Sequence, residues 1–189
     1  MAMKINGIGG TFPVPRVIKD YVFKPFAATM QANVAGGALK TINVKSVVDN
    51  AWVGVVQRSK QPLCNACFQK LFRKKTLAEI LAEADIVVHC LEPKPNIAET
   101  ALPEANTAGR DIGIDPALLF ATEQSALTCT LIHELAHVGG ASTDAGAART
   151  DAHAAEATLL SCSCANQYRK EVVGSIQVIR SGGVGSRYA

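Results

Sequence analysis

Apolar positions in the first third of the chain recur every three or four residues, which is the period of an amphipathic helix. One such stretch covers residues 23–35, and a second covers residues 44–59. In the second stretch the apolar side chains that share one face are Val47, Val48, Trp52, Val55 and Val56. The pattern therefore predicts that the chain begins with helices, preceded by an extended arm over residues 1–16.

The middle of the chain changes from helical to strand-like patterning. Residues 76–85 predict a short helix, in which Thr76 is the N-cap and Glu79 completes a capping box. The apolar run that follows is typical of a buried strand. The expected order is a strand over 86–91, a polar loop over 92–110 and a second strand over 111–120.

The strongest helical pattern covers residues 122–138, and Gly139 and Gly140 predict its end. We expect a last helix over about residues 147–170, then a short strand in "SIQVIRSGG" and a flexible tail over 182–189. Helices and strands are thus segregated along the chain, which favours an α+β fold. The length of 189 residues fits a single domain, residues 1–189.

Composition narrows the class of partner. Apolar residues make up 48% of the chain and charged residues 19%, which is typical of a globular protein. The net charge of +3 is spread along the chain and is too small to favour nucleic acid. No apolar run is long enough to span a membrane, and the N-terminus shows no signal peptide. We therefore expect synthesis in the cytoplasm, no nucleic-acid partner and no membrane span.

The six cysteines leave three interpretations open. They are Cys64, Cys67, Cys90, Cys129, Cys162 and Cys164. Buried free thiols are common in protein cores. Disulfides would indicate work in an oxidising environment, and the expected partners are the CxxC segment at 64–67 and the CxC segment at 162–164. A structural zinc site built from the same two segments is the third interpretation.

The segment "TLIHELAHVGGAS", residues 130–142, carries the candidate chemistry. On a helix His133 and His137 are about 40° and about 6 Å apart, so both imidazoles leave one face and can reach one zinc ion. Glu134 is turned by about 100° from His133, to the edge of that face. From there it can reach a water molecule on the metal and act as general base. The alternative is an ordinary buried helix that contains two histidines.

Through "HELAH" the sequence resembles the zincin metallopeptidases. The resemblance extends weakly from the strand before this helix to about residue 165, and residues 1–85 take no part in it. It implies a small antiparallel or mixed sheet packed on the HExxH helix and on a second ligand-bearing helix. It also implies a Zn²⁺ cofactor on His133 and His137, with Glu134 as the general base. We expect a peptide or protein substrate along an edge strand, within 86–91 or 111–120.

The third metal ligand differs among the zincin clans. Metzincins place it six residues after the second histidine, at Thr143 here, and also need a later methionine that this chain lacks. Aspzincins are similar to the chain at Asp144, and gluzincins at Glu156, nineteen residues after His137. Glu156 is preferred, because a second helix fixes a ligand better than a loop does. The alternatives are Asp144, Asp151 and His153.

His153 lies three residues before Glu156 and shares its helical face, so we expect it to stabilise the oxyanion or orient a neighbour. The expected function is zinc-dependent peptide-bond hydrolysis, with a zinc-bound water activated by Glu134. Without a signal peptide but with paired cysteines, the chain also resembles metallopeptidase-like toxins that bacteria deliver outside the cell or into a target periplasm. Such an effector implies a cognate immunity or inhibitor protein. The alternative is a non-catalytic, zinc-stabilised module that binds another protein.

Overall fold

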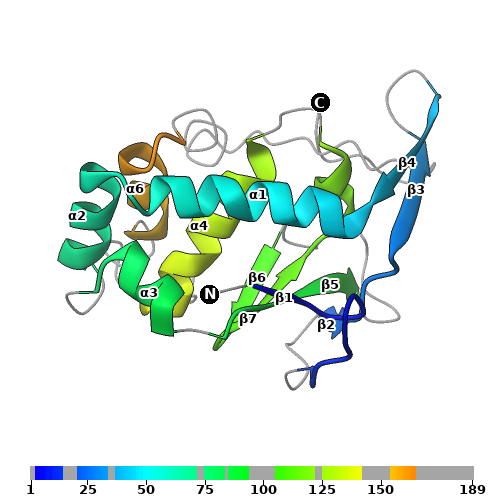
Figure 1. The fold of residues 1–189 in the computed structure, drawn as a ribbon, viewed down its shortest axis with the longest axis horizontal. Helices are drawn as coiled ribbons and strands as arrows, with labels where there is room; N and C mark the ends of the chain where they lie inside the picture. Colours follow the sequence, from blue (N-terminus) through cyan, green and yellow to red (C-terminus); the bar gives the residue numbers. More distant parts are fainter. Residues whose placement is uncertain are drawn as a thin grey trace.

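The computed structural model describes residues 3–14, 21–33, 37–71, 75–83, 85–93, 105–121, 125–141 and 154–164. Within these ranges helices and strands share the chain, which confirms the α+β class. Figure 1 shows helix α1 (Val44–Arg58) crossing helix α4 (Ala126–Gly139) beside a small sheet. A separate hairpin of β3 (Thr29–Asn33) and β4 (Leu39–Asn43) leads into α1 and projects beyond it.

The main sheet is mixed and is organised around β5 (Val87–Pro93). On one side, β1 (Lys4–Ile5) pairs parallel with the first residues of β5, and β2 (Tyr21–Lys24) pairs antiparallel with its last residues. On the other side lies β7 (Asp111–Ile114), parallel to β5, and then β6 (Ala105–Ala108), antiparallel to β7. Among the described strands β6 ends this side of the sheet. The expectation that 86–91 or 111–120 offers an edge is therefore wrong, because β5 and β7 are interior strands.

Of the helix that spacing predicts over residues 23–35, the described part, residues 23–33, is not helical. They contribute the end of β2 and the whole of β3. Pro25 disfavours the helical conformation at the residue before it, Lys24, because the proline ring clashes with the main chain of that residue. In β3 the buried Ala32 lies between exposed neighbours, so a period of two, set by pairing with β4, prevails over the helical period. The chain therefore begins with strands, and the expected order of helices before strands is wrong.

Two further segments differ from expectation. The polar loop expected over 92–110 contains strand β6. The strand expected over 111–120 stops at Ile114, because the Asp115 side chain accepts a hydrogen bond from the Ala117 N–H and starts the 3₁₀ helix η2 (Pro116–Phe120). Pro116 suits the first position of that helix, where no main-chain donor is required.

The elements with local signals are confirmed. Helix α1 matches the stretch 44–59, and β5 matches the strand expected over 86–91. Helix α3 (Leu77–Glu83) has the expected capping box: the Glu79 N–H donates to Thr76 Oγ1 at 3.1 Å, and the Thr76 N–H donates to Glu79 Oε2 at 2.7 Å. These bonds from Thr76 hold the pKa of Glu79 below its usual value.

The extended arm expected over 1–16 is tied to the sheet in its described part. Asn6 accepts a hydrogen bond from the Phe12 N–H at 2.9 Å, which turns its amide nitrogen towards Nδ1 of the fully buried His89, 3.0 Å away. Nδ1 must then be an acceptor, so Nε2 carries the proton and donates to Asp111 at 2.6 Å. This chain of hydrogen bonds links the end of β1 to β5 and β7.

Helix α4 occupies the centre of the molecule. It contacts α1, α3, the edge strand β6 and helix α6 (Ala154–Ser161). It lies close to α1 at Gly54, where an added Cβ would lie 2.8 Å from Oγ1 of Thr128. The same hydroxyl donates to the Ala51 carbonyl across the helix pair. No described helix is long and apolar enough to cross a membrane.

The last described segment is fastened by two disulfides. Helix α6 ends at Ser161, short of the expected end at 170; the strand and tail expected after it lie outside the described residues. Cys162 is bonded to Cys64 of α2 (Pro62–Leu71), and Cys164 to Cys129 of α4. In the chain-entropy model each bond stabilises the fold by about 4 kcal/mol. The pairing excludes a zinc site built from the CxxC and CxC segments.

Thiol labelling tests this pairing. Cys67 is free and half-buried, whereas Cys90 is free and buried. Burial, together with the charges of Glu92 and Asp115, raises the pKa of Cys90 to about 12, so its reactive thiolate is scarce at neutral pH. We expect iodoacetamide to label Cys67 alone in the native oxidised protein, both free thiols after denaturation, and all six cysteines after reduction. Mass spectrometry counts the labels, and native Cys67→Ser protein should take up none. Six labels without reductant would contradict the pairing.

Candidate metal centre

The C-terminal end of α4 is built by its glycines. Gly140 has a φ of 116°, in the left-handed region that favours glycine. The chain reverses there, so that the Gly140 N–H donates to the His137 carbonyl and the Ala141 N–H donates to the Ala136 carbonyl, both at 3.0 Å. This pair of bonds is a Schellman motif, and it ends the helix where the sequence predicts. The same turn brings the Ala141 carbonyl back against the last turn of the helix, beside His137.

This returning carbonyl determines how His137 presents its ring. His137 Nδ1 lies 3.3 Å from the Ala141 carbonyl oxygen. A carbonyl only accepts hydrogen bonds, so Nδ1 carries the proton and the neutral ring has its lone pair on Nε2. Metal-bound histidines are oriented in this way by a second hydrogen bond to the other ring nitrogen. The helix end therefore prepares Nε2 of His137 to bind a metal ion.

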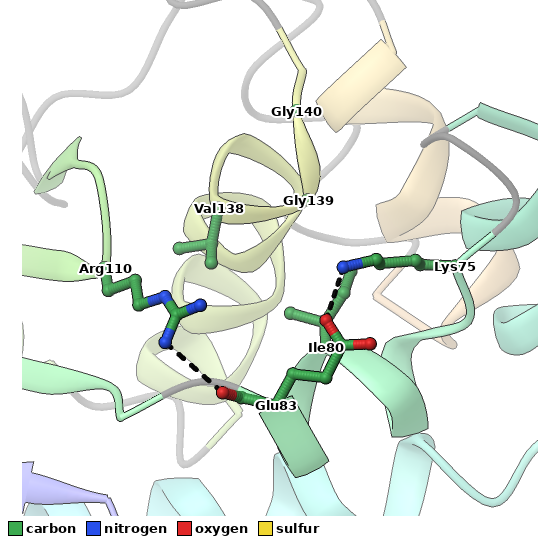
Figure 2. Close-up of a pocket in the computed structure, with 7 residues that line it drawn as sticks. All are labelled: Lys75, Ile80, Glu83, Arg110, Val138, Gly139 and Gly140. Carbon is green, nitrogen blue, oxygen red and sulfur yellow. Dashed lines mark hydrogen bonds and ion pairs between the residues drawn. The ribbon is translucent and has the colours of Figure 1, made fainter.

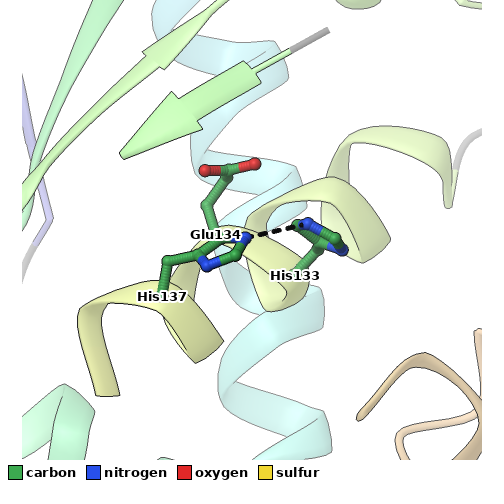
Figure 3. A group of neighbouring side chains, drawn as sticks. All are labelled: His133, Glu134 and His137. Atoms are coloured by element: carbon green, nitrogen blue, oxygen red, sulfur yellow. Dashed lines mark hydrogen bonds between the residues drawn. The ribbon is translucent and has the colours of Figure 1, made fainter. Parts of the chain in front are cut away.

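Nε2 of His133 meets Nε2 of His137 one turn away. The two nitrogens are 3.1 Å apart, and the rings meet edge to face with centroids 4.9 Å apart. Two imidazole nitrogens bound to one tetrahedral zinc ion at about 2.0–2.1 Å would be about 3.3 Å apart. The observed spacing fits an ion of that size. Figure 3 shows the two rings turned towards each other on the same face of α4.

Glu134 completes the group. Its ligand atom and those of the two histidines lie within 4.8 Å of one another, so the three side chains could hold a metal ion. The residue is 5% exposed, although it carries a carboxylate. The Thr107 hydroxyl of β6 donates to Glu134 Oε2 at 2.6 Å. Figure 3 shows the carboxylate on the strand side of the helix, while the imidazoles face each other across the turn.

Of the sequence candidates, the structure brings together His133, Glu134 and His137. Glu156 lies on α6, which packs against α4, but its side chain lies outside the described part of the chain. Three more candidates also lie outside the described residues: Asp144, Asp151 and His153. The third ligand and the role of His153 therefore remain predictions.

Thr107 is the residue at this site that the sequence analysis missed. It belongs to a segment that was expected to be a loop. The residues of β6, "ANTA", do not alternate between apolar and polar, so its alternating burial emerges only in the folded sheet and the sequence carries no strand signal here. Its pairing with Ile112 of β7 fixes its position in the sheet.

A pocket lies at the C-terminal end of α4. It is lined by Lys75, Ile80, Glu83, Arg110, Val138, Gly139 and Gly140. Figure 2 shows Lys75 and Arg110 reaching Glu83 from opposite sides, with Val138 of α4 above Arg110 in this view. Lys75 forms an ion pair with the Glu83 carboxylate, and Arg110 donates to the Glu83 carbonyl at 3.3 Å. With two cations and one anion, the rim carries a net positive charge.

No family model, curated protein sequence or solved structure matches this chain.

Metal analysis tests the centre directly. We expect purified protein to hold about one zinc ion per chain, and His133→Ala and His137→Ala to remove it, because each loses one of two facing nitrogens. Folded His89→Gln protein is the matched control: His89 is buried in the sheet on Asn6 and Asp111, so its loss should leave the zinc content unchanged. Native protein that neither contains zinc nor takes it up on addition would contradict the assignment.

Proposed function

We propose that this chain is a small zinc metallopeptidase, in which His133 and His137 hold the metal and Glu134 is the general base. The proposal rests on the geometry of α4, which has two imidazole nitrogens 3.1 Å apart and a buried carboxylate beside them. Two features of the fold support a zincin-like arrangement. An antiparallel edge strand, β6, lies against the HExxH helix, and a second helix, α6, packs on it as well.

The residues of the site divide the work of hydrolysis between them. A bound zinc ion would polarise the scissile carbonyl and make a water molecule acidic near neutral pH. Glu134 would accept the proton from that water and deliver it to the leaving amine. His137 would keep its Nε2 lone pair on the metal, because Ala141 holds the proton on Nδ1. The burial of Glu134 limits access of bulk water to the transferred proton.

Strand β6 is the proposed path of the substrate. Among the described strands it ends the sheet, and it lies against α4. An extended peptide can add to such an edge through main-chain hydrogen bonds, which suits a protein or peptide substrate. Thr107 of this strand contacts Glu134, so a peptide on β6 would pass close to the general base.

We assign the third ligand to Glu156 and a supporting catalytic role to His153. Glu156 belongs to α6, which packs on α4. The bond between Cys164 and Cys129 fastens the chain just after α6 to the helix of the two histidines. A helix anchored in this way suits a metal ligand better than a loop does.

The disulfides also bear on the compartment in which the protein works. Paired cysteines are typical of proteins that work in an oxidising environment. They support action outside a reducing cytosol. We propose that the chain acts there as an effector delivered to a target cell or its periplasm, with an immunity protein as partner.

Replacing Glu134 by glutamine tests the catalytic role. Glu134→Gln should keep the fold and the zinc but lower hydrolysis of an unfolded protein substrate by at least about 100-fold, because it removes the base and no proposed ligand. The control is Glu92→Gln, which neutralises a partly exposed glutamate on β5 and should leave the rate unchanged. Equal rates for Glu134→Gln and the parent would exclude Glu134 as the base. A parent that binds zinc but hydrolyses nothing would favour a non-catalytic module.

The third ligand is tested by zinc titration of three variants. Glu156→Ala should weaken zinc binding by at least about 100-fold, since it leaves two protein ligands. Asp144→Ala and Asp151→Ala should weaken binding less, and serve as matched losses of a carboxylate from the same part of the chain. Parent-like binding by Glu156→Ala, together with loss of zinc from Asp144→Ala, would transfer the role to Asp144.

A further inference from the structure

The bond between Thr107 and Glu134 joins two buried groups from different parts of the fold. Thr107 is 9% exposed and Glu134 is 5% exposed. The Thr107 hydroxyl donates to Glu134 Oε2 at 2.6 Å and also lies 3.3 Å from the main-chain carbonyl oxygen of Glu134. A separation of 2.6 Å is typical of a hydroxyl that donates to an ionised carboxylate, which is among the strong hydrogen bonds in proteins.

The proposed function requires that Glu134 act as a base. Its position would also allow its carboxylate to bind the metal ion as a ligand. Its ligand atom is within 4.8 Å of both imidazole nitrogens. Carboxylate oxygens bind zinc well, at about 2.0–2.2 Å. A small rotation of the side chain would therefore bring it into the ligand set. A carboxylate bound to the metal is a poor base, since its charge is already neutralised by the cation.

Thr107 is placed to prevent that rotation. It lies on β6, where its pairing with Ile112 of β7 fixes the main chain. Its hydroxyl holds Oε2 at the strand side of α4, and Figure 3 shows the carboxylate lying apart from the facing imidazoles. Releasing Glu134 towards the imidazoles would break a charge-assisted bond inside the protein, where water does not easily replace it.

We propose that Thr107 is a positioning residue that holds Glu134 on the edge strand as a base and keeps its carboxylate out of the metal's ligand set. This inference rests on the proposed function, which it deepens. In this proposal the Thr107 hydroxyl determines whether Glu134 acts as a general base or as a metal ligand.

Zinc affinity of Thr107 variants distinguishes this role from others. Thr107→Val keeps the shape of the side chain and removes the hydroxyl. We expect it to bind Zn²⁺ at least about tenfold more tightly than the parent, because Glu134 joins the ligands, and to lose at least about 100-fold in hydrolysis. Thr107→Ser retains a hydroxyl and should restore both properties. Thr107→Ala is the second variant, for use if valine does not fold at this position.

Two further variants complete the design. Thr107→Val combined with Glu134→Gln should show no gain in affinity, since an amide is a poor zinc ligand. Thr128 lies on α4, the helix of Glu134, and its buried hydroxyl donates to the Ala51 carbonyl at 3.2 Å. Thr128→Val removes that hydrogen bond and should lower the stability of the fold without changing the zinc affinity.

The affinity is measured by competition with a chromophoric chelator, with Zn²⁺ alone as the ligand and no substrate. Parent and variants that bind zinc but hydrolyse nothing would refute the proposed peptidase, while the affinities would still decide the role of Thr107. Zinc binding by Thr107→Val that is unchanged, or weaker by about tenfold or more, would overturn the proposal. The weaker result would mean that Thr107 supports a ligand.

Discussion

A buried carboxylate is the constraint on which the rest of this structure depends. Glu134 lies on α4, the helix that contacts α1, α3, α6 and the edge strand β6. Removing an ionised carboxylate from water costs on the order of several kcal/mol unless donors meet it. Thr107 of β6 supplies such a donor. The edge of the sheet, the central helix and the candidate metal centre are therefore coupled, and a change that displaces β6 also breaks a hydrogen bond to the buried carboxylate.

The sequence predicts those parts of the fold whose signals are local. The capping box of Thr76 and Glu79 spans four residues, and the end of α4 follows from two adjacent glycines. The spacing of His133 and His137 is equally local, since a helix brings such residues together whatever surrounds it. For that reason the pair is predictable even where the neighbouring strands are not.

The features that the sequence does not predict depend on partners distant along the chain. Residues 29–33 contain both helical and strand-like spacing, and pairing with β4 decides between them. Thr107 meets Glu134 across 27 positions of sequence, and Cys64 meets Cys162 across 98. The pattern around Thr107 is that of a short polar segment, and only the packing of α4 on β6 makes it part of the site.

The disulfide between Cys129 and Cys164 affects whether metal uptake should come before or after oxidation of the cysteines. Cys129 precedes His133 by four residues on the same helix, so its sulfur and that imidazole lie on one face. In a reduced chain its thiolate, with five others, would compete with the histidines for a metal ion, because thiolates are strong ligands for ions such as zinc. Bonding to Cys164 removes this competitor from the face. Metal taken up before oxidation would therefore be distributed over sulfur ligands, whereas metal taken up afterwards meets mainly the paired imidazoles.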